Sequence, residues 1–330
     1  MSEVLYLSEE DVKKTITIRE ALDAIEEGLK ATARGEVVHP PKIYMNVKEK
    51  PVSFIKPMAA YVKGQYPVVK IFTFFPENPI KHNLPTSSII ITLHDPETGV
   101  PVAILAGKHI TNVRTAATAA IAAKYLAKKT SKTVALIGAG PINEHVAYCL
   151  NEIFKIEEFR VVGKTKERRA EPLARKLKQK YNVETKAYSS EEIKTAISGA
   201  DIVSIATTAN KPLVKKEWLE PGMFIAKIGS FQELDPDIIK SADKVVVDWW
   251  EYVSTRVPEI RTLVEKGELS KEKIHAELHE VVAGLKSGRE SDSEKNVFIT
   301  IGIGVADSAV ANIVYKRALE RKYGITLKLL

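Results

Sequence analysis

Apolar residues follow two different periods along the chain, and the change between them divides the sequence. Near the N-terminus, Thr17 and Glu20 have the spacing of a capping box, and apolar side chains follow at helical intervals until Gly35. From Ile43 to Ala106 the apolar positions alternate or run continuously, as they do in strands. We expect strands at Val52 to Ile55, Val68 to Phe74, Ser88 to Leu93 and Val102 to Leu105, and then an alanine-rich helix from Thr111 to about Lys128.

From Thr133 onward, short apolar runs alternate with amphipathic helical segments. The expected strands are Thr133 to Ile137, Glu158 to Val162, Glu184 to Ala187, Asp201 to Ala206, Phe224 to Ile228 and Lys244 to Val247. Such alternation predicts a parallel sheet with helical crossovers. The last helix, Val305 to Tyr323, is expected to pack back on the first domain. The prediction is therefore an α/β chain in which residues 116–304 form one domain and residues 1–115 with 305–330 form a second, α+β domain.

The first of these later strands runs into a glycine turn and then a helix. Gly138-Ala139-Gly140 is followed by Pro141 and Ile142, and this strand–turn–helix order is typical of a Rossmann-type, dinucleotide-binding unit. Asn143 occupies the place of the third glycine in the usual fingerprint, so the motif also fits an ordinary tight turn. Further cofactor contacts are expected from residues that follow later strands, which are Ala206, Thr207, Gly229 and Ser230.

The end of the second strand of this unit indicates which nicotinamide cofactor to expect. An NAD-binding fold usually has an acidic residue here, for the ribose 2′-hydroxyl. This chain has Gly163, Lys164, Thr165 and Lys166 instead. Lysine and threonine side chains can donate hydrogen bonds to a 2′-phosphate. Cations are unfavourable beside the positive end of a helix dipole, so their presence here suggests a functional role. The sequence favours NADP(H), with NAD(H) and a solvated helix start as the alternatives.

Composition excludes several classes of protein. The chain has 330 residues, 45% of them hydrophobic and 28% charged, which is sufficient for two globular domains. The net charge is +7, but Lys and Glu are interspersed along helices, so a nucleic-acid partner is not expected. No apolar stretch predicts a membrane span or a signal peptide, and the single cysteine, Cys149, favours a reducing, cytoplasmic setting. Three glutamines beside abundant Lys and Glu suggest a thermophilic source.

Two charged residues in the first domain are not explained by packing alone. Lys70 interrupts an apolar strand, and a lysine there must reach an edge or meet an anion. Arg114 lies early in the alanine-rich helix. A structural salt bridge is the alternative to a functional role for each. His275 and His279 are four residues apart on a predicted helix, but no third metal ligand is evident, so we expect no metal site.

Several separated segments of the chain resemble the ornithine cyclodeaminase/mu-crystallin family. The matching residues are His39-Pro40-Pro41-Lys42, Lys70 to Phe74, Thr111 to Ala117, Ile137 to Gly140, Gly163 to Glu167, Glu233-Leu234-Asp235 and Gly302 to Asp307. The resemblance covers nearly the whole length. It implies a homodimer built through the β-rich domain and a substrate that is a small amino or imino acid.

The resemblance also implies roles for individual residues. Lys42, Lys70 and Arg114 would hold the substrate carboxylate, with Lys70 and Arg114 in the catalytic role. Lys42 departs from the arginine common in the family, and lysine supplies a point charge instead of a two-pronged donor. Met58 and Asp307 are added as candidate substrate-binding residues.

Ser230 is a second departure from the family pattern. It stands where cyclodeaminases, which the chain resembles, have an aspartate after the glycine, so reduction of a C=N bond is favoured over cyclisation. The expected function is that of an NAD(P)H-dependent oxidoreductase on the C–N bond of a small amino or imino acid, as a ketimine or pyrroline-2-carboxylate reductase or an alanine dehydrogenase. The alternatives are an ornithine cyclodeaminase that releases ammonia, and a non-catalytic NADPH-binding protein like mu-crystallin.

Overall fold

The computed structural model describes residues 3–329, and the chain in it divides into two compact units. Unit 1 comprises Met1–Arg114 and Ile303–Leu330, and unit 2 comprises Thr115–Gly302. The boundary falls within one continuous helix, α4 (Lys108–Leu126). Among residues 3–329, no helix combines the length and the apolarity that a membrane span requires.

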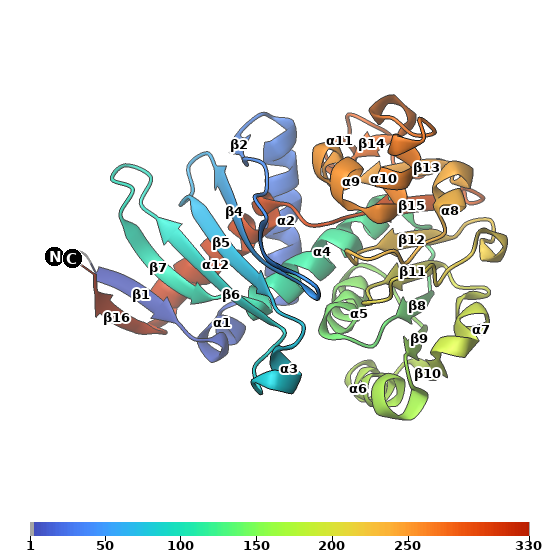
Figure 1. Cartoon of the computed structure of the whole chain (residues 1–330), viewed down its shortest axis with the longest axis horizontal. Coiled ribbons are helices and arrows are strands. Elements are labelled where there is room, and N and C mark those ends of the chain that lie inside the picture. The colour runs from blue at the N-terminus through green and yellow to red at the C-terminus, as the bar shows by residue number, and fades with distance from the viewer. Residues whose placement is uncertain (1–2, 330) are drawn as a thin grey trace. The chain divides into compact units, whose positions relative to one another are not determined.

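Unit 1 contains a mixed sheet with the strand order β16-β1-β7-β6-β5-β4-β2, and β3 pairs with β4 outside this path. All neighbours are antiparallel except β1 and β7. Helix α12 packs against α2 and β4 within this unit, as Figure 1 shows. The elements are β1 (Glu3–Leu7), α1 (Glu9–Thr15), α2 (Ile18–Ala33), β2 (Val37–Val38), β3 (Met45–Glu49), β4 (Val52–Val62), β5 (Val68–Phe74), α3 (Asn78–Lys81), β6 (Ser87–His94), β7 (Pro101–Ala106), α12 (Gly304–Arg321) and β16 (Ile325–Lys328).

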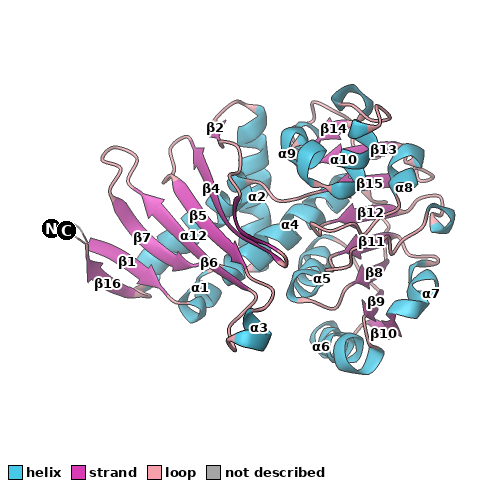
Figure 2. Ribbon diagram, viewed as in Figure 1, coloured by secondary structure: helices cyan, strands magenta, loops and turns pink. Residues whose placement is uncertain are grey.

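Unit 2 is built on a fully parallel sheet with the order β10-β9-β8-β11-β12-β15-β13-β14. Helices lie on both sides of the row of strands (Figure 2). The elements are β8 (Thr133–Ile137), α5 (Pro141–Ile153), β9 (Glu158–Gly163), α6 (Glu171–Tyr181), β10 (Glu184–Ser189), α7 (Ile193–Ile197), β11 (Ile202–Ile205), β12 (Phe224–Lys227), α8 (Pro236–Ser241), β13 (Lys244–Val247), α9 (Trp250–Arg256), α10 (Pro258–Glu265), β14 (Ala276–Glu277), α11 (Leu278–Val282) and β15 (Asn296–Ile299).

The strand order of unit 2 confirms the predicted α/β fold. Its first five strands in chain order, β8 to β12, are arranged as in a dinucleotide-binding sheet, and the order reverses between β8 and β11. Strands β8, β11, β12, β13 and β15 are almost wholly buried, which explains why they appear in the sequence as continuous apolar runs. In such a sheet, ligands bind outside the carboxyl ends of the strands, at the reversal point.

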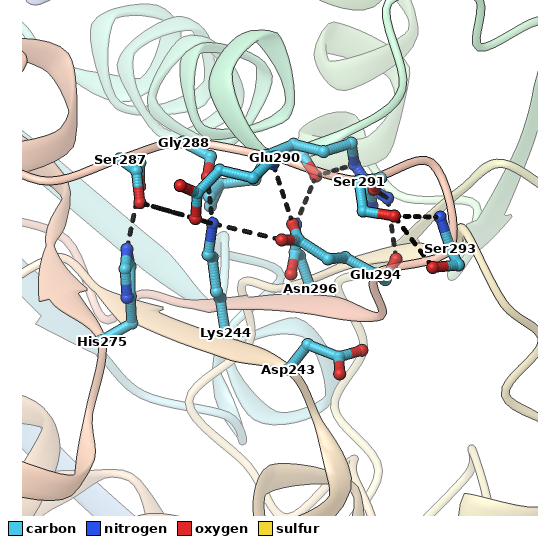
Figure 3. A network of polar contacts seen from close by, with 12 residues as sticks. Asp243, Lys244, His275, Ser287, Gly288, Glu290, Ser291, Ser293, Glu294 and Asn296 are labelled. Carbon is cyan, nitrogen blue, oxygen red and sulfur yellow. Dashed lines mark hydrogen bonds and ion pairs between the residues drawn. The ribbon is translucent and has the colours of Figure 1, made fainter.

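The amino ends of the same strands carry a polar network with a structural role. Lys244, at the start of β13, donates hydrogen bonds to Ser287 Oγ and to the Gly288 carbonyl, and it forms ion pairs with Glu290 and Glu294 (Figure 3). These contacts fix the loop before β15 to the sheet. Because all strands are parallel, this network lies at the edge opposite the expected ligand site.

One expected helix is wrong. The segment around His275 and His279 is divided between strand β14 and helix α11, so the two histidines do not share a helix face. The carbonyl of Ser287 lies 2.8 Å from His275 Nε2, and His279 Nδ1 lies 3.5 Å from a Glu277 oxygen. The pairing of β14 with β13 overrides the helical pattern here. No group of three or more potential metal ligands occurs within residues 3–329.

Candidate active site

Lys70 is buried in unit 1 and meets an anion. Strand β5 places its side chain on the sheet face covered by α12, where its Nζ donates to both oxygens of Asp307 at 2.7 Å. Arg114, from α4, lies with its Nε 3.0 Å from Asp307 Oδ1. Lys70 and Asp307 are each 1% exposed and Arg114 is 7% exposed. The three residues form a buried cluster of two cations and one carboxylate, which we call the Lys70 cluster.

Burial and the neighbouring charges shift the pKa values of both Lys70 and Asp307. Burial lowers the pKa of Lys70, the Arg114 guanidinium lowers it further, and Asp307 opposes both, which leaves the pKa at about 7. Burial alone would raise the pKa of Asp307, but Arg114 and Lys70 hold it below its ordinary value. The three side chains together carry a net positive charge while Lys70 is protonated, and this charge favours the approach of a further anion.

The structure brings the other expected substrate residues to the same cluster. Met58, on β4, is paired with Lys70 across the sheet and is buried. Lys42 is half-buried in the segment before β3 and lies near enough to help lower the pKa of Asp307. The sequence predicts Asp307 only as a candidate substrate-binding residue. The structure places it in the first turn of α12 as the carboxylate that joins Lys70 and Arg114.

The glycine turn in unit 2 has the geometry that close backbone approach requires. Gly138 has φ 103°, and a Cβ there would lie 2.3 Å from the Ala206 carbonyl oxygen. Gly140 is the N-cap of α5, and a Cβ there would meet nothing within 4 Å. The helix N-terminus is thus open, with Pro141 at its first position and the N–H groups of its first turn available to an anion. This end of the sheet fits the pyrophosphate of a dinucleotide cofactor.

Asn143 explains the missing third glycine. It is fully buried, its Nδ2 donates to the carbonyls of Ile137 and Gly138 at 2.9 and 2.7 Å, and its Oδ1 accepts from Ser204 Oγ at 2.7 Å. The side chain therefore joins the turn to β8 and β11. Sequence reasoning treated this residue as a defect in the motif, because its partner Ser204 is 61 residues away.

The last residue of β9, Gly163, leaves no room for an acidic side chain. A Cβ on Gly163 would lie 2.7 Å from Arg169 Cβ and 2.9 Å from the Ala170 nitrogen. Lys164 and Thr165 are exposed, Lys166 is half-buried, and Ser190 Oγ lies 3.4 Å from the Lys164 carbonyl. Lys164, Thr165 and Lys166 provide cations and a hydroxyl group at this edge, and Lys166 lies near enough to Glu192 to help lower its pKa.

Two buried acids at the carboxyl ends of the strands did not emerge as site residues from the sequence. Glu233 contacts Thr207 and Gly229, which are two of the expected cofactor residues, whereas Ser230 is exposed. Asp248, after β13, accepts from Thr300 and from the backbone nitrogens of the segment that leaves β15. Asp248 could have been suspected, because it follows an apolar strand directly.

Comparison with known proteins agrees with this geometry. The model of the ornithine cyclodeaminase/mu-crystallin family matches residues 2–322. The chain belongs to this family. The alanine dehydrogenase of Archaeoglobus fulgidus is 36% identical to this chain over 330 residues, which cover 99% of this chain and 98% of that protein. The family expected from the sequence is confirmed.

Two solved structures of the ornithine cyclodeaminase/mu-crystallin type have the same fold over the whole chain. The Δ1-pyrroline-2-carboxylate reductase of Thermococcus litoralis, in complex with NADH and L-proline, has a TM-score of 0.92 and 32% identity, and covers 98% of this chain and 99% of that chain. An archaeal alanine dehydrogenase dimer with bound NAD has a TM-score of 0.89 and 35% identity, and covers 100% of both chains. These relatives are nicotinamide-dependent oxidoreductases, which confirms the expected class of chemistry and a nicotinamide cofactor.

Replacing Asn143 by the glycine of the usual fingerprint should destabilise this member of the family. Asn143→Gly removes three buried hydrogen bonds and leaves Ser204 Oγ without its acceptor, so we expect a loss of about 2–4 kcal/mol in the free energy of unfolding. Urea denaturation measures it. Ser204→Ala, which removes one of the bonds, should cost less, and the double variant should cost less than the sum. Equal stability of Asn143→Gly and the wild type would contradict this role.

Proposed function

We propose that the chain is a nicotinamide-dependent oxidoreductase that interconverts a small imino acid and the corresponding amino acid. The Lys70 cluster is the observation that carries this proposal, because it brings two cations and a single carboxylate together in a buried position, and its net positive charge suits the carboxylate of a substrate. The proposal assigns the substrate carboxylate to unit 1 and the cofactor to the carboxyl ends of β8, β11 and β12 in unit 2. Relatives that act on pyrroline-2-carboxylate and on alanine support it.

Each cation of the Lys70 cluster has a distinct task in this proposal. Arg114 donates to the carboxylate of the substrate, and Lys42 adds a point charge nearby. These contacts orient the adjacent carbon of the C=N bond to receive a hydride. The reduced cofactor, when bound, would supply that hydride from C4 of its nicotinamide ring. Lys70, with its pKa at about 7, holds a proton that it can give to the substrate nitrogen and later recover.

Two other functions for this site remain to be separated by experiment. Ornithine cyclisation would release ammonia without net consumption of cofactor, and Ser230 in place of an aspartate argues against it. A protein that only binds NAD(P)H and a small ligand would show no turnover with any substrate. NAD(P)H oxidation should be measured with pyrroline-2-carboxylate and with pyruvate plus ammonia, beside ammonia release from ornithine. We expect oxidation with at least one of the imine substrates and no cyclisation.

Loss of either cation in the Lys70 cluster should abolish most of the reductase activity. Arg114→Met should lower kcat/KM by about 10²-fold, because it removes a charge-assisted contact to the substrate that is worth up to about 3 kcal/mol. Arg114→Lys should recover part of this loss. Lys30→Met, which breaks an exposed ion pair in the same unit, is the control and should leave kcat/KM unchanged. Full activity of Arg114→Met on every imine substrate would exclude this assignment.

A rise in pH should slow imine reduction and speed up the reverse reaction, the oxidation of the amino acid. Because the pKa of Lys70 is about 7 in the free protein, its proton is present below pH 7 and lost above it. For imine reduction, kcat/KM should therefore fall as the pH rises through about 7, and for amino acid oxidation it should rise. In Lys70→Met, the remaining kcat/KM should no longer depend on pH around 7 in either direction, and the circular dichroism spectrum should match that of the wild type. If the pH dependence of kcat/KM persists in Lys70→Met, another group carries the proton.

NADP(H) is the proposed preferred cofactor, although both solved relatives hold NAD or NADH. The support is local. Gly163 leaves no room for the acid that would bind a ribose 2′-hydroxyl, and Lys164 and Thr165 provide donors for a 2′-phosphate. NAD(H) lacks this phosphate but keeps every contact at the glycine turn, so we expect it to be used less efficiently.

Reversing the charge at residue 164 should change cofactor preference without affecting the imine substrate. In the wild type, kcat/KM should be higher with NADPH than with NADH, and Lys164→Glu should lower the ratio by about 10-fold or more, since one charge-assisted contact is lost. Lys178→Glu, an equal charge change elsewhere on the surface of unit 2, should leave the ratio unchanged. A wild-type preference for NADH would refute NADP(H) selectivity.

A homodimer through the sheet of unit 1 is also proposed. Ile71 on β5 and Ile90 on β6 are paired across the sheet, are 42% and 51% exposed, and alternate with Lys70 and Ile91, which point to the buried face. Paired isoleucines on an open sheet face favour burial against another surface. The dimeric state of the archaeal alanine dehydrogenase supports a second copy of this chain as that surface.

A charge on this sheet face should dissociate the dimer. We expect sedimentation equilibrium to give twice the chain mass for the wild type and a lower mass for Ile90→Lys, because a lysine cannot be buried there without a partner. Leu319→Lys, which alters an exposed apolar residue on α12, should remain dimeric. A monomeric wild type, or a dimeric Ile90→Lys variant, would exclude this interface.

A further inference from the structure

A buried carboxyl group joins the loops that follow β11 and β12. Glu233 is 0% exposed, and its Oε1 accepts hydrogen bonds from the backbone nitrogen and the hydroxyl of Thr207, both at 2.6 Å. Its Oε2 lies against Gly229, where a Cβ would be only 1.8 Å away. Within residues 3–329, Oε2 has no hydrogen-bond partner. One side chain therefore contacts both Thr207 and Gly229, and a side chain at position 229 would displace the Glu233 carboxyl group from this place.

Two further buried charges hold Glu233 and Gly229 in place. Lys227, the last residue of β12, donates from Nζ to the Gly229 carbonyl at 2.7 Å and lies 3.4 Å from Glu259 Oε2. Glu259, in α10, accepts at Oε1 from the backbone nitrogens of Glu233 and Leu234 at 2.8 and 2.9 Å. Lys227 and Glu259 are 0% and 1% exposed. We refer to Glu233, Lys227 and Glu259 as the Glu233 cluster.

The position of the Glu233 cluster indicates what it is for. In a dinucleotide-binding sheet, the half that begins with β8 and β9 holds the adenosine, and the half that contains β11 and β12 holds the nicotinamide nucleotide. Thr207 and Gly229 follow β11 and β12 at their carboxyl ends. Three buried charges are costly and are often no more stable than apolar side chains of the same size. Their presence at this edge of the sheet therefore indicates that the cluster determines the geometry of the loops rather than adding to the stability of the fold.

We propose that Glu233 is a positioning residue that, held by Lys227 and Glu259, fixes Thr207 and Gly229 for the nicotinamide half of the cofactor. This inference rests on the proposed function, because it takes the cofactor to bind at these strand ends. Glu233 acts through the two loops and does not itself contact the reacting atoms.

The state of the Glu233 carboxyl links this geometry to pH. Burial raises the pKa of Glu233 to about 7, the hydrogen bonds from Thr207 and the charge of Lys227 on β12 oppose the rise, and Glu259 on α10 adds to it. As the pH rises through about 7, the carboxyl becomes anionic. It then accepts more strongly from Thr207 and attracts Lys227 more strongly, so both loops are held more firmly and the cofactor should bind more tightly.

Direct binding of NAD(P)H, without substrate, tests the proposal. Nicotinamide fluorescence should show wild-type Kd values that decrease by several-fold between pH 6 and pH 8. Glu233→Gln keeps an acceptor for Thr207 but cannot ionise, so its Kd should match the wild type at pH 6 and stay constant to pH 8. Glu233→Ala should raise Kd about 10-fold or more at pH 8, and Thr207→Val, which removes only the hydroxyl donor, should raise it less.

A matched control exists in the same sheet. Glu294→Gln alters the lysine–glutamate network at the amino ends of the strands, shown in Figure 3, and should leave Kd and its pH dependence unchanged even if it lowers the melting temperature. No NAD(P)H binding by the wild type would overturn the proposed function itself. Wild-type binding, with an unchanged Kd in Glu233→Ala or with the wild-type pH profile in Glu233→Gln, would overturn the positioning role alone. If Glu233→Ala does not fold, Glu233→Gln and Thr207→Val decide the question.

Discussion

The ion pair between Lys70 and Asp307 is the interaction on which the candidate site in unit 1 depends. A lysine in the middle of a buried strand needs a counter-charge, and the chain supplies it 237 residues later, from α12. Close packing of α12 makes the contact possible, because Gly304 lies where a Cβ would be 2.7 Å from the Ala59 carbonyl, and Gly28 lies where a Cβ would be 3.1 Å from a Val305 methyl group. Two glycines, one on α2 and one at the start of α12, thus bring the carboxylate within reach of both cations.

The sequence predicted most of the fold because its strongest patterns are local. The apolar runs of β8 to β13 and the helical period of α2 are set by neighbours along the chain, so their positions could be predicted. Strands β1 and β16 were missed. They pair with each other from opposite ends of the chain, and Ile325 and Leu327 of β16 remain exposed, so no burial period marks that strand. The helix expected around His275 failed because pairing with β13 outweighs the local helical pattern.

The sequence could predict which charged residues belong to the candidate site, but not the ion pairs and hydrogen bonds that join them to distant parts of the chain. The sequence indicated that Lys70 must reach an edge of the sheet or meet an anion, yet nothing local selects Asp307 from the other acids of the chain. Asn143 counted against the glycine turn because its value depends on Ser204, which folding brings beside it. Glu233 was noted only as part of a family motif, since its roles toward Thr207 and Gly229 arise from tertiary contacts. Hydrogen bonds between distant segments are the part of the site that periodicity does not encode.

The two buried clusters differ in how their charges are compensated, and this difference separates their roles. In the Lys70 cluster, two cations lie beside one carboxylate, and burial together with the charge of Arg114 lowers the pKa of Lys70. A buried cluster with a net positive charge attracts a ligand anion, and a lysine with a pKa of about 7 can exchange a proton near neutral pH. In the Glu233 cluster, one cation lies beside two acids, and these acids accept hydrogen bonds from the backbone N–H groups of Thr207, Glu233 and Leu234. Since those donors belong to the loops themselves, the second cluster orders the backbone instead of binding a ligand. Substrate chemistry therefore belongs to the Lys70 cluster, and the Glu233 cluster determines the shape of the loops that receive the cofactor.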